Sequence, residues 1–351
     1  MTVDVDEHST GKIFDDNVEM IFTSFGMFII DEIHYLDGSS LFDVIGGAGT
    51  YAVYGARVFL PIPKSKGVGW IVDAGSDFPE AIKKELFSLQ TTMIFREDPS
   101  RLTTRGWNGY TENETRAFKY TTPKKRITSE DITGTKLLES RTFHLICSPE
   151  RAVSLITGLN DQRKALGTGL PPAVIMWEPV PDLCKPEHLE ACFEVLPFVD
   201  VLSPNVAEAS AFFGIEEPTE KSKIEEVGER FLNYMQPQAA IVMRAGANGC
   251  LVLSKSFGKK WLEAYHTSYP ERVVDPTGAG NACVGGLCAG YVLSGGNVLV
   301  ATCYGNVAAG LAIEQVGLPR LKLSSDKIGE ERWNDSSMRE RLEEYRRRVG
   351  V

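Results

Sequence analysis

Several features that would identify common protein classes are missing from this sequence of 351 residues. The amino-terminal stretch, MTVDVDEHSTGKIFDDN, is acidic and has neither the basic start nor the apolar segment of a secretory signal. No apolar run approaches the roughly 18 to 20 residues of a membrane-spanning helix. The dinucleotide-binding pattern GxGxxG directly after a first strand is absent, and so is the P-loop pattern GxxxxGKS or GxxxxGKT. We therefore expect a cytoplasmic protein with no membrane contact, and neither a nicotinamide dehydrogenase nor a P-loop enzyme.

Basic residues are also in short supply, since 37 Lys and Arg face 47 Asp and Glu and give a net charge of -10. With no long basic run, a nucleic acid is a poor partner, although a nucleotide could still bind in a local positive pocket. No two cysteines have the CxxC spacing of a zinc site, so we expect buried free thiols. The seven are Cys147, Cys184, Cys192, Cys250, Cys283, Cys288 and Cys303.

Short apolar runs alternate with helical stretches along most of the chain. This alternation predicts an α/β fold with a mostly parallel central sheet and helices on both faces. The continuous apolar run from Ala173 to Trp177 is typical of a strand buried on both sides. The predicted strands are Ile21 to Ile30, Val68 to Val72, Phe143 to Cys147, Val174 to Trp177, Val199 to Leu202, Ala240 to Met243 and Cys250 to Leu253.

Two segments differ from this pattern. From Thr91 to Arg126, Thr, Arg, Tyr and Phe alternate between turn-forming residues, which indicates either antiparallel strands of a lid or a polar excursion between helices. Near the end, Ser337 and Glu340 fit a capping box before a helix with Met338, Leu342, Tyr345 and Val349 on one face. We predict a main domain over residues 18–322, its lid supplied partly by 91–126, and a C-terminal helical tail over 323–351.

The sharpest motif is DPTGAGN, from Asp275 to Asn281, followed by a helix of small residues. Glycines let the backbone turn tightly, so that consecutive N–H groups point outward at the positive end of a helix. The motif predicts an anion site, although a glycine-rich turn can also be purely structural.

Two further motifs follow predicted strands. In PNVAE, from Pro204, Asn205 and Glu208 could cap a helix or organise a magnesium ion and its waters. In RAGANG, Gly246 and Gly249 could make a hairpin turn, and Arg244 at a strand end would pair with a carboxylate or face an anion.

Taken in order, these motifs, together with Asp31, GGAG from Gly46, VGWIVDAGSD from Val68 and GNVAAGLAIEQVG from Gly305, resemble the ribokinase-like (PfkB) family of carbohydrate and nucleoside kinases. The resemblance spans about Ile21 to Pro319. The WEP at Trp177 and the GAGN ending look most like a fungal branch of that family.

The resemblance implies a ribokinase-like fold with a small β lid, ATP and Mg²⁺ as cofactors, and a small hydroxylated molecule as phosphate acceptor. A homodimer through the lid is a further expectation. The roles implied by motif position are an anion hole at Gly278, Ala279 and Gly280; magnesium and phosphate at Asn205 and Glu208; nucleotide contacts at Arg244, Gly246, Gly249 and the segment Asn306 to Gly310; and acceptor contacts at Asp31, Gly46, Gly47 and Tyr51.

Three departures from the family pattern bear on activity. Asn281 stands where the family has an aspartate that takes the acceptor's proton, and a carboxamide cannot act as a base. Tyr51 stands where a sugar-binding asparagine is found, and Arg244 where a threonine is usual. The sequence thus leaves open a slow or specialised kinase, in which Asn281→Asp should raise the rate, a nucleotide-binding pseudokinase, and an enzyme of other chemistry on the same scaffold.

Overall fold

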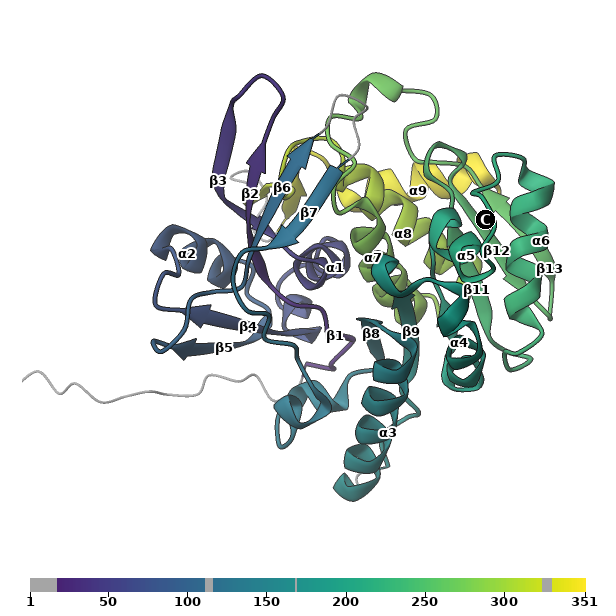
Figure 1. Ribbon diagram of the computed structural model, residues 1–351, viewed down its shortest axis with the longest axis horizontal. Coiled ribbons are helices and arrows are strands. Elements are labelled where there is room, and N and C mark those ends of the chain that lie inside the picture. Colours follow the sequence, from purple (N-terminus) through teal and green to yellow (C-terminus); the bar gives the residue numbers. More distant parts are fainter. Residues whose placement is uncertain (1–17, 111–115, 168, 324–329) are drawn as a thin grey trace, which may run out of the picture.

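The computed structural model describes residues 18–110, 116–167, 169–323 and 330–351, and its centre is a sheet of nine strands (Figure 1). The strand order is β13-β12-β11-β10-β9-β8-β1-β4-β5. Pairing is parallel from β5 across to β11, and β12 and β13 are added antiparallel. The strands are β1 (Phe22–Ser24), β4 (Val68–Gly75), β5 (Thr92–Asp98), β8 (Thr142–Cys147), β9 (Val174–Pro179), β10 (Val201–Leu202), β11 (Ala240–Arg244), β12 (Cys250–Ser254) and β13 (Gly258–Leu262).

Helices cover both faces of this sheet, as the sequence predicts. Consecutive residues of a strand point to opposite faces, so Trp70 and Val72 of β4 enter one apolar core and Ile71 enters the other. Residues of α1, α2, α7, α8 and α9 belong to the first core, and those of α3, α4, α5 and α6 to the second. The helices are α1 (Ala48–Arg57), α2 (Glu80–Ser88), α3 (Pro149–Leu166), α4 (Leu189–Val195), α5 (Val206–Phe212), α6 (Lys221–Leu232), α7 (Ala279–Leu293), α8 (Val298–Ala312) and α9 (Met338–Val349).

A separate four-stranded sheet, in the order β3-β2-β6-β7, projects from the main sheet beside α1 and α7 as a lid (Figure 1). Its strands are β2 (Ile29–His34), β3 (Ser40–Gly46), β6 (Arg105–Tyr110) and β7 (Arg116–Tyr120). The segment 91–126 therefore supplies only half of the lid, because β5 pairs along its length with β4 at the edge of the main sheet.

The predicted first strand, Ile21 to Ile30, is wrong as one element. Its first part is β1 in the main sheet, and its last residues open β2 in the lid. Apolar character continues through the connection because Phe25 and Phe28 are buried there, so the run does not reveal the break. Asp31 consequently lies within β2 rather than after the first strand.

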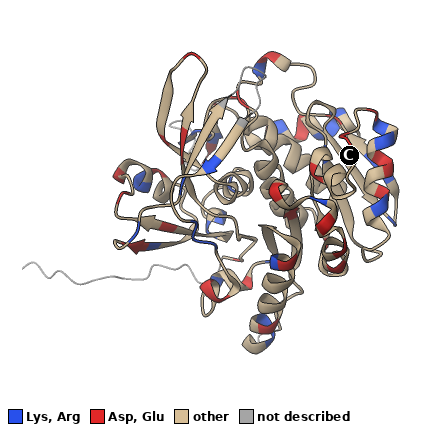
Figure 2. Cartoon of the chain, in the orientation of Figure 1, with Lys and Arg blue, Asp and Glu red and all other residues tan. Residues whose placement is uncertain are grey.

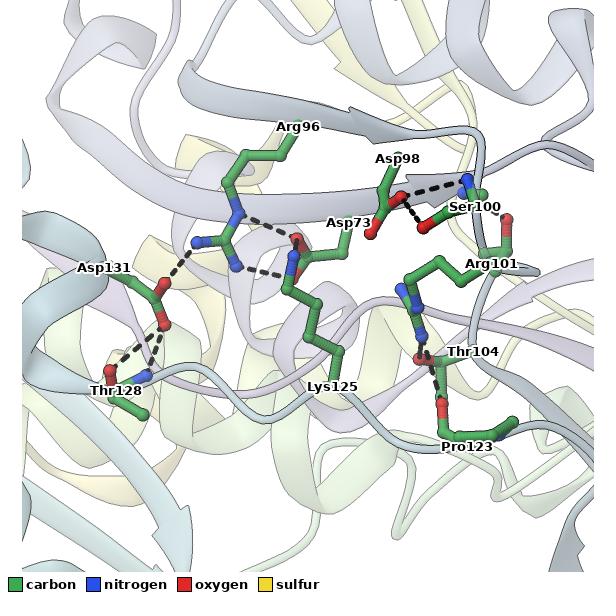
Figure 3. A network of polar contacts seen from close by, with 12 residues as sticks. Asp73, Arg96, Asp98, Ser100, Arg101, Thr104, Pro123, Lys125, Thr128 and Asp131 are labelled. Atoms are coloured by element: carbon green, nitrogen blue, oxygen red, sulfur yellow. Dashed lines mark hydrogen bonds and ion pairs between the residues drawn. The ribbon is translucent and has the colours of Figure 1, made fainter.

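The chain returns from the lid along a segment that ionic and hydrogen-bonding groups hold against β4 and β5 (Figure 3). Arg96 makes a bidentate pair with Asp73, with donor–acceptor distances of 2.7 and 2.6 Å, and a further pair with Asp131. Lys125 lies 3.1 Å from the same Asp73 carboxylate. Arg101 donates to the Pro123 carbonyl at 3.0 Å. The lid is thus attached to the main sheet at a fixed base.

The cysteine prediction is confirmed, and so is the helix after Ser337, although only one of the two bonds of the predicted capping box is found in the described residues. All seven cysteines are free and buried. The Ser337 side chain accepts the N–H of Glu340, and α9 buries Met338, Leu342 and Tyr345 against the core that includes α8. The short strands β14 (Leu321–Leu323) and β15 (Glu331–Trp333) form a two-stranded sheet.

Within the described part of the chain, no helix has the length and apolar character needed to cross a membrane. Acidic and basic residues are interspersed on the exposed helices, for example along α6 (Figure 2).

Candidate active site

A cavity of about 590 Å³ lies where three neighbouring parallel strands, β9, β10 and β11, end and where α7 begins. Ligand sites of open parallel sheets are found at such carboxyl ends, and this volume lies within the range of small-molecule sites. Eight of the predicted site residues line it, namely Asn205, Arg244, Gly246, Gly249, Ala279, Gly280, Asn306 and Gly310. The structure therefore brings together segments more than a hundred residues apart.

The start of α7 has the geometry of an anion site. Gly278 has a φ of 77°, and a Cβ atom there would lie 2.2 Å from the Tyr51 ring, so both the turn and the packing favour glycine. Ala279 already donates its N–H to the Pro276 carbonyl at 3.2 Å. The N–H groups of Gly280 and Asn281 have no acceptor in the described residues and remain for a ligand.

Arg244, at the end of β11, joins two buried carboxylates. Its Nη2 lies 2.8 Å from Glu178 Oε1 and 3.1 Å from Glu208 Oε2. Its Nη1 packs against the α7 start, because a Cβ atom at residue 280 would lie 1.9 Å from it. No protein acceptor for this Nη1 is found in the described segments, and Arg244 lines the cavity. One guanidinium can thus neutralise both carboxylates and still offer a donor to a bound anion.

Glu178, near the end of β9, is a residue that the sequence analysis did not assign to the site. Its carboxylate is 3% exposed and accepts from His144 Nε2 at 3.1 Å and from Asn281 Nδ2 at 3.0 Å, both on Oε2. Burial alone would raise the pKa of Glu178, but Arg244 and the bonds from His144 and Asn281 hold it below its ordinary value. The WEP motif offered one signal, an acid at the carboxyl end of an apolar strand.

Asn205 and Glu208 form the capping box of α5. The Asn205 side chain accepts the Glu208 N–H at 2.7 Å, and Glu208 accepts the Asn205 N–H at 2.8 Å. Burial raises the pKa of Glu208 to about 7, although Arg244 opposes the shift.

These bonds leave little room for direct coordination of a metal ion by Glu208. The described residues contain no cluster of three or more His, Cys, Asp or Glu that could hold one. Because Mg²⁺ usually keeps several of its waters, the pair fits contact with such an ion through water rather than as ligands.

The predicted acceptor residues lie together between the lid and α1. Gly46 and Gly47 end β3 and precede α1, and a Cβ atom at residue 46 would lie 1.8 Å from Asp31 Oδ2. Asp31 and Tyr51 line a separate space of about 10 Å³, together with Asp275 and Thr277 of the α7 turn. This space holds about one water molecule.

The wall of the cavity formed by α8 is tied to the end of the chain. Asn306 Nδ2 donates to the Tyr345 hydroxyl at 2.7 Å, and Arg348 of α9 donates to the Tyr265 carbonyl at 2.7 Å. Gly310 lets the Tyr265 ring pack closely, since a Cβ atom there would lie 2.4 Å from it. Gly246 and Gly249 have positive φ values of 53° and 84° in the hairpin between β11 and β12.

Comparison with known proteins gives consistent matches over this architecture. A model of the pfkB family of carbohydrate kinases matches residues 122–321. Protein MAK32 of Saccharomyces cerevisiae is 38% identical over 348 residues, which cover 93% of this chain and 92% of that protein.

Solved structures match as well. A ribokinase from Giardia lamblia superposes with a TM-score of 0.70 at 15% identity, covering 93% of this chain and all of that chain (100%). A ribokinase from Cryptococcus neoformans in complex with ADP gives a TM-score of 0.62 at 20% identity, covering 85% and 94%.

Proposed function

Because the chain belongs to the pfkB family of carbohydrate kinases, we propose that it transfers the γ-phosphoryl group of ATP to a hydroxyl group of a sugar, nucleoside or related alcohol. The observation that carries this proposal is the cavity of about 590 Å³ at the start of α7, with Arg244 and open backbone N–H groups at one end.

These groups would act mainly on charge. The acceptor oxygen forms a bond to the γ-phosphorus as the bond to the β–γ bridging oxygen breaks, and ADP leaves. The hydroxyl proton ends on an oxygen of the new phosphate ester or in water. Arg244 Nη1 and the N–H groups of Gly280 and Asn281 would stabilise the negative charge on the phosphoryl oxygens. Such positioning and charge stabilisation supply most of the rate in phosphoryl transfer, so the reaction does not depend on a carboxylate at residue 281.

A magnesium ion bound to the nucleotide would neutralise further phosphate charge. Asn205, which lines the cavity, and Glu208 behind it would contact the waters of that ion.

The acceptor would bind against Asp31, whose carboxylate can accept hydrogen bonds from hydroxyl groups. The space of about 10 Å³ beside Asp31 takes about one water molecule, so a sugar or nucleoside would place a single hydroxyl group there.

The test combines binding with turnover. MgATP should raise the thermal midpoint, since binding to the folded state stabilises it by about 2.7 kcal/mol at a hundredfold excess over Kd. ADP release should then be measured across a panel of sugars, nucleosides and small polyols. A protein that shows neither a midpoint shift nor calorimetric heat at millimolar MgATP does not have the proposed activity.

A second candidate function, nucleotide binding without transfer, is favoured by Asn281, whose carboxamide cannot remove the proton of an acceptor hydroxyl. Tyr51 packs on the α7 turn and helps fill the space where an acceptor would bind. This pseudokinase would bind MgATP with a clear midpoint shift and release no ADP with any member of the panel. Replacing Tyr51 by Ala would enlarge the space, and transfer that begins only in this variant would favour the pseudokinase for the wild type.

A further inference from the structure

Glu178 and Asn281 meet beside the cavity-lining residues Arg244 and Gly280, and they come from elements about a hundred residues apart. Asn281, in the first turn of α7, is half-buried, and its Nδ2 lies 3.0 Å from Glu178 Oε2. The Glu178 carboxylate lies against three groups that can donate hydrogen bonds. Arg244 lies at Oε1, and His144 and Asn281 lie at Oε2.

The orientation of the Asn281 amide follows from this chemistry. An ionised carboxylate only accepts hydrogen bonds, so the NH₂ group rather than the oxygen of Asn281 must face Glu178. The lowered pKa of Glu178 keeps the carboxylate ionised. The carbonyl Oδ1 of Asn281 then points away from Glu178, and no protein donor to it is found in the described residues.

The remaining contacts fix the carboxylate itself. His144 is fully buried, with Nε2 against Glu178 and Nδ1 3.1 Å from Ser24 Oγ. Ser24 Oγ in turn accepts the Gly26 N–H at 3.0 Å. Both ring nitrogens of His144 are therefore engaged, one with Glu178 and the other with Ser24. Glu178 is therefore held on both oxygens and cannot turn away from Asn281.

We propose that Glu178 is a positioning residue, which holds Asn281 Nδ2 and so presents the Asn281 carbonyl oxygen to the acceptor hydroxyl, and which requires an amide rather than a carboxylate at residue 281. The inference rests on the proposed function. Asn281 is then matched to Glu178, and it is not simply a base that has been lost.

The inference changes the expectation for Asn281→Asp. An aspartate there would place a second carboxylate about 3 Å from Glu178, and two like charges at that distance cannot both stay ionised without a large shift in pKa. The substitution should slow the protein rather than accelerate it. Combining it with Glu178→Gln moves the carboxylate from residue 178 to residue 281 at unchanged net charge. In the double variant, His144 Nε2 can accept a hydrogen bond from the new Gln side chain at residue 178, and His144 Nδ1 can donate to Ser24.

The experiment compares wild type, Glu178→Gln, Asn281→Asp and the double variant. The thermal midpoint of Asn281→Asp at pH 8 should fall by about 5 °C or more, with a smaller fall at pH 5.5, and the double variant should return to within about 2 °C of wild type. Asn297→Asp is the matched control, because Asn297 caps α8 through the N–H groups of Leu299 and Val300 and an aspartate can do the same.

Turnover distinguishes positioning from structure. With adenosine, D-ribose and glycerol as probes, Glu178→Gln should lower kcat about tenfold or more while the KM for ATP stays within about twofold, and the double variant should recover kcat. A kcat of Glu178→Gln that follows only its folded fraction would overturn the positioning role.

Two other outcomes separate the inference from the proposed function. The pairing of the two residues would be overturned if the change in thermal midpoint of the double variant equals the sum of the changes in the two single variants. It would also be overturned if Asn281→Asp is as stable as wild type and turns over faster. Absence of turnover by wild type with every probe would instead overturn the proposed function. The thermal midpoints of the four proteins would still decide whether Glu178 requires an amide at residue 281.

Discussion

Replacing Arg244 by Met tests whether one guanidinium serves both the protein and the nucleotide. The change removes the cation 2.8 Å from Glu178 and 3.1 Å from Glu208, whose side chains are only 3% and 6% exposed. Breaking a buried ion pair from one side costs about 3–5 kcal/mol, because the remaining charge is left unpaired. Loss of the Nη1 contact to phosphate should add about 1.5–3 kcal/mol to the free energy of nucleotide binding, which is roughly a 10- to 150-fold rise in Kd.

Urea unfolding at pH 8 measures the first effect and calorimetry with MgATP the second. The loss of unfolding free energy should be smaller at pH 5.5, because the abandoned carboxylates then take up protons more readily. Adding Glu178→Gln and Glu208→Gln to Arg244→Met removes the unpaired charges. This triple variant should regain most of the stability and none of the affinity for MgATP. If affinity returns together with stability, Arg244 acts on the fold alone and does not contact phosphate.

Three shorter predictions concern the same cavity. Burial raises the pKa of Glu208 to about 7, so ionisation of Glu208 costs stability as pH rises through that value. Between about pH 5 and pH 8, the unfolding free energy of wild type in urea titrations should fall by up to about 3 kcal/mol relative to that of Glu208→Gln. If the unfolding free energies of the two proteins change with pH in parallel, the raised pKa is contradicted. Tyr345→Phe removes the hydroxyl that bonds both Asn306 and the Glu263 carbonyl. The free energy of unfolding should fall by about 1–3 kcal/mol in denaturation experiments, and calorimetry should show a weaker affinity for MgATP. An unchanged affinity would show that α9 does not influence nucleotide binding. Gly280→Ala would place a methyl group 1.9 Å from Arg244 Nη1 and displace it; binding of MgATP should fall as in Arg244→Met, and an unchanged Kd would show that Nη1 is not needed.

Sequence patterns predict most of the main sheet because each of its buried strands is an apolar run that can be recognised from neighbouring residues alone. The run from Val174 is apolar on both faces, and β9 is buried in the centre of the sheet. The lid is harder to predict. Its strands β2 and β6 pair in parallel although some seventy residues separate them, and nothing in either segment indicates the other.

The candidate site shows the same division. Glycine turns and strand-end polar residues are visible in sequence, so Gly280, Arg244 and Asn205 could be predicted, and the structure gathers them in one cavity. The capping box of Asn205 and Glu208 and the hairpin at Gly246 are likewise confirmed. The role of Glu178 could not be predicted, because it depends on contacts with His144, Arg244 and Asn281 that only the folded chain creates.

The contacts of α9 with the cavity wall have a consequence for how the protein responds to its ligand. Tyr345 and Arg348 hold the backbone carbonyls of Glu263 and Tyr265, and Tyr265 itself lines the cavity. Binding free energies are reciprocal, so if an ordered α9 tightens the hold on a nucleotide, a bound nucleotide must to the same degree reduce fraying of α9. The last turn of the chain should then exchange its amide hydrogens more slowly when MgATP is bound. Amide exchange at the carboxyl terminus would therefore indicate whether a nucleotide is bound in the cavity. A bulky protein fused to this end should weaken nucleotide binding.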